Sequence, residues 1–460
     1  MNKIIDLYDI KKKDINDKQI KYYHLDKYEQ YHPKDNYHQM FFDIDEFDYI
    51  EPIKRLKNYF IDDKYYSSIY DKIKKIPIKN KMINNIDEYH KILELVDIEN
   101  IILQYIKCRP ESIILFLYNV DTNYIVNEIK YDYNIYYWKD IELTTNGIKR
   151  LLYELYDEMT LQKRIEYIDK LILEIKIKKI GIIWIERKDK ISRFKREIIF
   201  RIQTLNNKIK ENQIYINTHF YQTIENSQII LNNNSLEMLL QGNINILYTN
   251  GFLKFNTLRN WCYNNLSLLD MTRLIIYGST LLYALGIRSL NDINGILIPV
   301  VKNQTEIELE ELINFNLTHK IPFIDIAIED SKYRNKSYNK EIKDYIKSHN
   351  LTFSEISLNP RYHWYYQGIK MYHLDYEIEK KCLNIINKNN INDIADLIVM
   401  YFNYRLLLKN YIQMKNKKLI FCNIKNKEIT ISQSKIIYKK IENNYGNISK
   451  ISEKTIISIL

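Results

Sequence analysis

The middle of the chain alternates short apolar runs with longer stretches in which apolar residues recur every three or four positions. Short apolar runs between polar segments are typical of buried strands, whereas the longer spacing is typical of helices that cover a sheet. The predicted strands are Ser112–Tyr118, Lys179–Ile185 and Ile214–Ile216. The predicted helices are Thr145–Lys176, Arg193–Lys210 and Phe220–Leu240. This alternation predicts an α/β domain of unknown role over residues 106–265.

The flanking regions have different patterns. Residues 1–105 form a polar region that is rich in Tyr. Residues 266–345 are predicted to hold a central mixed sheet with helices, and residues 346–460 a mainly helical domain. In that last domain Ile391–Leu408 is the clearest amphipathic helix. The chain is therefore predicted to be a multidomain protein of the α/β and α+β classes.

Composition adds information about the source and about partners. The 460 residues include 41 Tyr, and Ile, Asn and Lys are also abundant, which is the bias of an A/T-rich genome such as that of a virus or a parasite. The formal net charge is +10. A solvated basic surface explains that charge, and so does a polyanion partner such as RNA, because lysines near phosphates release counterions on binding. Both interpretations stay open.

The cysteines and the hydropathy pattern concern the compartment. Cys108, Cys262, Cys382 and Cys422 are far apart and form no CxxC pair, which argues against a structural zinc site and a disulfide framework. No run of about 18 apolar residues occurs, so no membrane span is expected. These features predict a cytoplasmic protein, in the host cytoplasm or the virion if the source is viral.

One short segment combines a turn, a helix and an acidic strand. Residues 273–299 read RLIIYGSTLLYALGIRSLNDINGILIP, in which an apolar strand runs into Gly278 and Ser279 and a helix then leads to a second strand. Gly lets the backbone approach a ligand closely, and a Ser hydroxyl can donate to a phosphate. Asp292 and Asn294 are two residues apart, so both project from one face of the second strand.

A third acidic position follows in another apolar strand. Asp325 lies within IPFIDIAIED, with Ile on both sides. A carboxylate in so apolar a strand is costly unless it is paired, hydrogen-bonded or metal-bound. A neighbouring strand could therefore bring Asp325 beside Asp292. Clustered carboxylates are the ligands that Mg²⁺ prefers.

This ordered set of residues resembles the nucleotidyltransferase superfamily of the polymerase-β type. The resemblance covers Ile275 to Asp330, and within the superfamily it is most similar to the catalytic subunit of viral, poxvirus-like poly(A) polymerases. It implies a nucleotidyltransferase-like central sheet. It also implies that Gly278 and Ser279 bind a nucleoside triphosphate, and that Asp292 and Asp325 are catalytic and bind Mg²⁺ or Mn²⁺.

The chain departs from the family pattern at one catalytic position. The superfamily has Asp-x-Asp, whereas this chain has Asp292-Ile293-Asn294, so the position of the central catalytic carboxylate is Asn294. An Asn side chain offers one neutral carbonyl oxygen where Asp offers two anionic ones. An active enzyme and a catalytically degenerate relative are therefore both open hypotheses.

The segment after the motif contains further candidates. Lys370 is the best candidate for a phosphate-binding lysine, and its alternative role is that of a solvated lysine at a strand end. The run from Arg361 to Tyr366 holds four aromatic residues, which could stack nucleobases or serve ordinary packing. Lys381 and the later Asp393 and Asp396 resemble the end of some nucleotidyltransferase domains, where a helix packs beneath the site.

Three functions are consistent with the sequence. The first is transfer of a nucleoside monophosphate, AMP in a poly(A) polymerase, from a triphosphate to an RNA 3′ end. The second is a degenerate paralogue that binds RNA or a protein. The third is transfer to a small-molecule acceptor. RNA and a nucleoside triphosphate are the expected partners, and a homo-oligomer or a viral protein partner is a further option.

Overall fold

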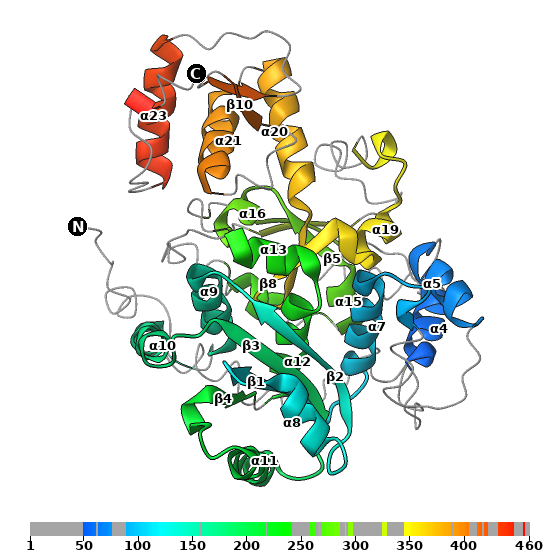
Figure 1. The fold of residues 1–460 in the computed structure, drawn as a ribbon. Helices are drawn as coiled ribbons and strands as arrows, with labels where there is room; N and C mark the ends of the chain where they lie inside the picture. Colours follow the sequence, from blue (N-terminus) through cyan, green and yellow to red (C-terminus); the bar gives the residue numbers. More distant parts are fainter. Residues whose placement is uncertain are drawn as a thin grey trace.

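The structure of the protein is a computed structural model (Figure 1). It describes residues 49–60, 63–75, 89–156, 159, 161–217, 219–241, 255, 257–262, 266, 268–285, 290, 293–297, 324–328, 345–388, 390–403, 412–415, 418–421, 431–445 and 454–455. The described part contains a four-stranded sheet, a five-stranded sheet, a two-stranded hairpin and many helices, which confirms a mixed class of helices and sheets with more than one unit.

The first sheet has the strand order β2-β3-β1-β4, and every neighbouring pair in it is antiparallel. Its strands are β1 (Ser112–Tyr118), β2 (Ile135–Glu142), β3 (Lys179–Glu186) and β4 (Ile214–Ile216). The sequence predicted β1, β3 and β4 correctly, since each is a continuous apolar run. It missed β2, because Lys139, Asp140 and Glu142 interrupt the apolar pattern there.

Helices cover both faces of this sheet. Along β1 the even-numbered Ile114, Phe116 and Tyr118 belong to one hydrophobic cluster, and the odd-numbered Ile113 and its neighbours belong to another. The first cluster packs against α4 (Ile50–Tyr59), α5 (Tyr65–Ile73), α7 (Leu95–Lys107), α9 (Thr145–Leu155), α10 (Leu161–Ile175), α12 (Phe220–Ile230) and α13 (Asn233–Gln241). The second packs against α8 (Thr122–Ile129) and α11 (Ile191–Leu205), and a short 3-10 turn, η1 (Glu211–Gln213), precedes β4. Burial on both faces explains why β1 reads as an unbroken apolar run.

Two predicted helices are each divided in the structure. The region Thr145–Lys176 forms α9 and α10 instead of one helix. The region Phe220–Leu240 forms α12 and α13, because Asn232 accepts hydrogen bonds at Oδ1 from the amide and the hydroxyl of Ser235 and so caps a new helix. Helical periodicity continues across both breaks, so the pattern of apolar residues alone did not reveal them.

The second sheet is mixed, in the order β7-β6-β5-β9-β8. Its strands are β5 (Leu274–Tyr277), β6 (Ile293–Leu297), β7 (Ile324–Ile328), β8 (His363–Tyr366) and β9 (Ile369–Tyr372). The pairs β5·β6 and β8·β9 are antiparallel, and the pairs β6·β7 and β5·β9 are parallel. The short helix α15 (Leu268–Arg273) precedes β5, α16 (Ser279–Ala284) follows it, and α19 (Phe353–Leu358) and the turn η2 (Pro360–Tyr362) precede β8. The expected mixed sheet is thus present, with strands from both sides of position 345.

Buried ion pairs of Lys381 join two helices of the C-terminal part. It contains α20 (Leu374–Lys388), α21 (Ile391–Asn403), the hairpin β10 (Ile412–Lys415) and β11 (Lys418–Phe421), and α23 (Ile431–Tyr445). The ammonium of Lys381 lies 2.7 Å from Asp396, 2.9 Å from Asp393 and 3.4 Å from Glu377. These carboxylates raise the pKa of Lys381, which keeps it charged and ties α20 to α21.

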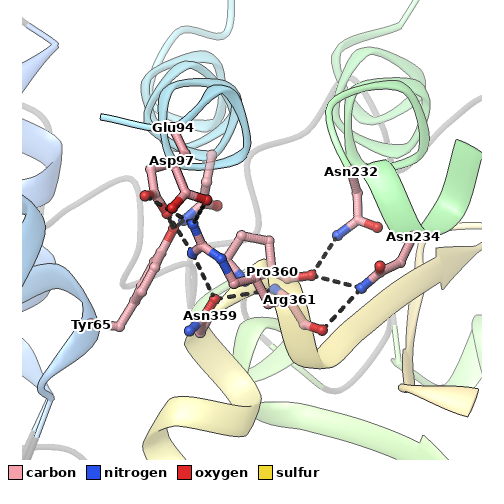
Figure 2. Close-up of polar contacts among 9 residues, drawn as sticks. Tyr65, Glu94, Asp97, Asn232, Asn234, Asn359, Pro360 and Arg361 are labelled. Atoms are coloured by element: carbon pink, nitrogen blue, oxygen red, sulfur yellow. Dashed lines mark hydrogen bonds and ion pairs between the residues drawn. The ribbon is translucent and has the colours of Figure 1, made fainter. Parts of the chain in front are cut away.

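The first sheet and the helices that cover it, α4 to α13, are called the first unit here. Strand β8 lies at the edge of the second sheet, and side chains of the first unit cover that edge. Asn232 and Asn234, at the start of α13, both donate to the carbonyl of His363, over 3.2 and 3.0 Å. The amide of Tyr365 donates to the hydroxyl of Ser235 over 2.8 Å. Figure 2 shows the same two asparagines reaching the carbonyls of the turn η2.

An ion pair fastens the other side of η2 (Figure 2). The guanidinium of Arg361 donates to both carboxylate oxygens of Asp97 in α7, over 2.7 and 3.1 Å. It also donates to Glu94 over 2.8 Å, and the hydroxyl of Tyr65 donates to Asp97. The side chain of Asp97 is 7% exposed and that of Glu94 is 78% exposed. Arg361 is therefore bound by one buried and one solvated carboxylate.

None of the helices among the described residues is both long enough and apolar enough to cross a membrane.

The two carboxylates that bind Arg361 predict unequal effects on stability. Replacing Asp97 by Ala removes a bidentate pair and a Tyr65 hydrogen bond from a buried place, so we expect a loss of about 2 kcal/mol in the free energy of unfolding. Replacing Glu94 by Ala is the matched control and should cost at most about 0.5 kcal/mol, because that carboxylate is solvated. Urea unfolding measures both values, and equal losses would contradict the assignment.

Candidate functional site

The predicted motif lies across three neighbouring strands of the second sheet. In the register of β5 and β6, Tyr277 pairs with Asn294. In the register of β6 and β7, Asn294 pairs with Asp325. Position 294 therefore lies between the strand that leads into Gly278 and the strand that carries Asp325. Asp325 is on the strand next to β6, and Asn294 is its register partner. Asp292, which the sequence placed beside Asp325, lies outside the described residues.

Gly278 forms the turn at the end of β5. Its φ is 77° and its ψ is −142°, a conformation that residues with a side chain rarely adopt. A Cβ at this position would lie 3.7 Å from Nδ2 of Asn294, which is an ordinary contact. The backbone angle, and not lack of space, therefore requires glycine. The same distance shows that the amide of Asn294 lies beside the turn.

Ser279 directly follows the turn and begins α16. It is half-buried, while Gly278 before it is buried. Helix α16 has six residues, so it is too short for a strong field at its N-terminus. Any affinity for phosphate here would come from the turn itself and from the hydroxyl of Ser279.

The motif contains two acidic residues, Asp292 and Asp325. Asp292 lies outside the described residues, directly before β6, and the backbone of Asp325 is described within β7. No group of three His, Cys, Asp or Glu side chains within the described part could hold a metal ion. The oxygen donors of the motif, two carboxylates and one amide, are hard ligands that suit Mg²⁺ or Mn²⁺. Asn294 gives that set one negative charge fewer than three carboxylates would.

Lys370 is buried, and its ammonium is directed into the protein. It is 3% exposed and donates to the backbone carbonyls of Thr272, before β5, and Ser357, in α19. Burial lowers the pKa of Lys370 well below its usual range, and the nearby Lys107 lowers it further. Lys370 therefore joins β9 to α15 and α19, and this arrangement does not present it to a bound phosphate.

Lys380 is the lysine of this segment that lies near the turn. Its Nζ is 6.0 Å from the centre of the Tyr277 ring, and Tyr277 is the last residue before Gly278. Lys380 is half-buried on α20. The sequence could not separate the two lysines, because both follow the motif and only the packing of α20 shows that Lys380 lies near Tyr277.

The aromatic run after Arg361 serves packing. Trp364, Tyr365 and Tyr366 are 1%, 5% and 4% exposed. The indole of Trp364 donates to the carbonyl of Tyr372 on β9, over 3.0 Å. A stacked base would need an open ring face, so base stacking by these three residues does not fit the structure.

The structure adds a residue that sequence reasoning missed. Arg150, on α9 of the first unit, donates to the carbonyl of Ala284 over 2.8 Å and to that of Met238 over 3.4 Å. Ala284 is the last residue of α16, whose first residue is Ser279. The first unit therefore holds the far end of the helix that starts at the turn. Nothing in the sequence links two positions so far apart.

Glu154, one helical turn after Arg150, binds the hairpin between β8 and β9. Its carboxylate accepts from the amide of Gln367 over 3.1 Å. Burial raises the pKa of Glu154 to about 7, and the Gln367 hydrogen bond and the cations Arg150 and Arg259 oppose that rise without cancelling it. The ion pair of Arg259 with Glu225, with oxygens at 2.5 and 2.6 Å, lies in the same interface.

Comparison with known proteins does not add a family to this geometry. The chain matches no protein-family model, no curated protein and no solved structure. The interpretation of the site therefore depends on the residues of the motif and on their arrangement in the second sheet.

The raised pKa of Glu154 predicts a specific dependence of stability on pH. A carboxyl whose pKa is higher in the folded state binds an extra proton there, so its contribution is complete below its unfolded value and is lost as the pH rises through about 7. We expect Glu154→Gln to raise the melting temperature at about pH 8 and to change it little at about pH 5.

Glu128→Gln, on the exposed face of α8, is the control for that measurement. Its difference in melting temperature from the wild type should be the same at both pH values. A Glu154→Gln difference that does not grow with pH would contradict the burial argument.

Proposed function

We propose that this protein is a nucleotidyltransferase-fold protein that binds a nucleoside triphosphate at the end of β5 and transfers a nucleoside monophosphate, AMP in the poly(A) polymerase case, to an RNA 3′ end. One observation supports the proposal most. Three adjacent strands bring together the Gly278 turn, Asn294 and Asp325, in a register that the sequence motif alone did not contain.

Each residue has a distinct task in this proposal. The backbone at Gly278 approaches the triphosphate, because its conformation leaves no side chain in the way. Ser279 donates its hydroxyl to a phosphate oxygen, and the amide of Asn294 beside the turn helps to orient the phosphates. Asp292 and Asp325 would hold Mg²⁺ or Mn²⁺, which stabilises negative charge on the entering and leaving oxygens.

The transfer itself is an in-line substitution at phosphorus. The oxygen of the RNA 3′-hydroxyl forms a bond to the α-phosphorus, and the bond from that phosphorus to the bridging oxygen breaks. Pyrophosphate leaves, and the hydroxyl proton passes to solvent. The chain contributes chiefly by position and electrostatics, as phosphoryl transfer in general requires.

The second candidate is a catalytically degenerate relative that binds RNA or a protein. Asn294 favours it, because losing one unit of charge opposite a divalent ion removes several kcal/mol of metal binding. In this candidate the turn still binds the triphosphate or a similar anion, and no transfer follows. A transferase that acts on a small-molecule acceptor is the third candidate.

A transfer assay separates the enzyme from the degenerate relative. Purified full-length protein is incubated with labelled ATP, several RNA primers and Mn²⁺. We expect weak incorporation by the natural chain and an increase of about tenfold or more for Asn294→Asp, because a carboxylate restores the charge opposite the metal.

Asn294→Gln is the control, since it changes the side chain without restoring charge. Incorporation that appears only in Asn294→Asp would identify a decayed enzyme. No incorporation by either chain with any primer would reject the transferase, and equal rates for Asn294→Asp and Asn294→Gln would reject the role of the charge.

The salt dependence of RNA binding separates RNA from a small-molecule acceptor. A chain of net charge +10 that contacts several phosphates should lose affinity for a single-stranded RNA by about tenfold or more between about 50 and 200 mM salt. Fluorescence anisotropy measures this slope. Weak binding that does not change with salt would favour a small-molecule acceptor.

A further inference from the structure

Two parallel strands of the second sheet end next to each other. Ile276 of β5 pairs with Met371 of β9 in parallel register. Strand β5 ends one residue later at Tyr277, and β9 likewise ends one residue later, so the first residues beyond the two strands are Gly278 and His373. Ligands of sheets with parallel strands bind outside the carboxyl ends of those strands. His373 therefore belongs to the same end of the sheet as the phosphate turn.

The imidazole of His373 has one occupied and one available nitrogen. Its Nδ1 lies 3.2 Å from the backbone amide of Asp375, which donates to it, and 3.3 Å from the Asp375 carboxylate. When Nδ1 accepts from that amide, the proton of the neutral ring is on Nε2. The described residues provide no partner for Nε2, and the side chain is 21% exposed.

Two other histidines of the same unit show what a structural role requires. His363 is 2% exposed on β8, and its Nδ1 contacts the carbonyl of Ile356. His349 uses both ring nitrogens, because Nδ1 contacts the carbonyl of Tyr345 and Nε2 lies 3.4 Å from Glu379. His373 differs from His363 in being accessible, and from His349 in that no residue of the described ranges contacts its Nε2.

A cationic side chain, that of Lys380, points to the same chemistry. Lys380 lies on α20, which begins directly after His373, and its Nζ is 6.0 Å from the ring of Tyr277. Lys380 thus lies near the last residue of β5, and His373 directly follows β9, the strand that pairs with β5. An imidazole donor and an ammonium near a glycine turn form a suitable environment for an anion with several phosphate groups.

We propose that His373 contacts the polyphosphate tail of the nucleotide, donating from Nε2 to a phosphate oxygen while Asp375 holds its Nδ1. Lys380 supplies a positive charge to the same tail. This inference rests on the proposed function, because it places the triphosphate at Gly278. It assigns to this chain a phosphate contact from the segment after β9 that the motif does not include.

Binding of inorganic tripolyphosphate and of ATP to the full-length protein tests the proposal by calorimetry, with and without Mg²⁺. His373→Phe removes the donor and should weaken both affinities about tenfold, the loss of one hydrogen bond to a charged group. His373→Gln keeps an N–H donor at nearly the same distance from the backbone and should stay within about threefold of the wild type. This rescue would not occur if the ring served only packing.

His349→Phe is the matched control and should bind both probes like the wild type, and melting curves confirm that each variant folds. Equal losses for His373→Phe and His349→Phe, or no loss for His373→Phe, would overturn the inference while leaving the triphosphate site in place. Binding that depends on His373 in a chain without transfer activity would support the inference and reject the transferase. A wild type that binds neither probe would reject both.

Discussion

Strand β8 ends its sheet, and the backbone groups along its outer edge need partners other than a strand. Meeting that need is the constraint on which the rest of the structure depends. An edge strand presents backbone amides and carbonyls that must find partners when they are buried. Here the partners are side chains, since Ser235 accepts from the amide of Tyr365, and Asn232 and Asn234 donate to the carbonyl of His363. Each of these bonds has a fixed direction, so they determine where the two sheets lie relative to each other.

This arrangement connects the first unit to the candidate site through one continuous sheet. Strand β8 pairs with β9, β9 pairs with β5, and β5 leads into the turn at Gly278. The first unit also contacts the far end of α16 through Arg150. The turn is therefore held by its own strand, β5, and by the helix that follows it, α16. The first unit contacts both, through β8 and β9 in one case and through Arg150 in the other. A site that binds phosphate by backbone geometry needs this rigidity, because small displacements of an amide weaken its hydrogen bonds.

The sequence predicted those parts of the fold that depend on local pattern. Strands β1 and β3 were found because apolar residues cover both of their faces, whereas β2 was missed because Lys139 and Asp140 lie within it. The order of strand, turn, helix and second strand in the motif was also found, and the acid predicted to open that second strand, Asp292, lies outside the described residues. The roles of side chains whose partners lie far away in the sequence could not be predicted from it. From the sequence, Lys370 could be a lysine at a strand end, and only its hydrogen bonds to the carbonyls of Thr272 and Ser357 show that its amino group is buried. The hydrogen bond from Arg150 to the carbonyl of Ala284 could not be predicted either, because the two residues are distant in the sequence.

Asn294 has a further physical consequence, which follows from its place beside the turn. Its Nδ2 lies near Gly278, so the amide offers hydrogen-bond donors at the position where an Asp-x-Asp pattern would place a carboxylate. A carboxylate at that position repels a polyphosphate unless a cation lies between them, because like charges at close range are strongly unfavourable in a partly buried site. An amide removes that repulsion and can contact a phosphate directly. Compared with a carboxylate, an amide at position 294 thus disfavours a divalent cation and favours direct contact with an anion. Metal-dependent chemistry and binding of an anion would therefore respond in opposite directions to this one side chain.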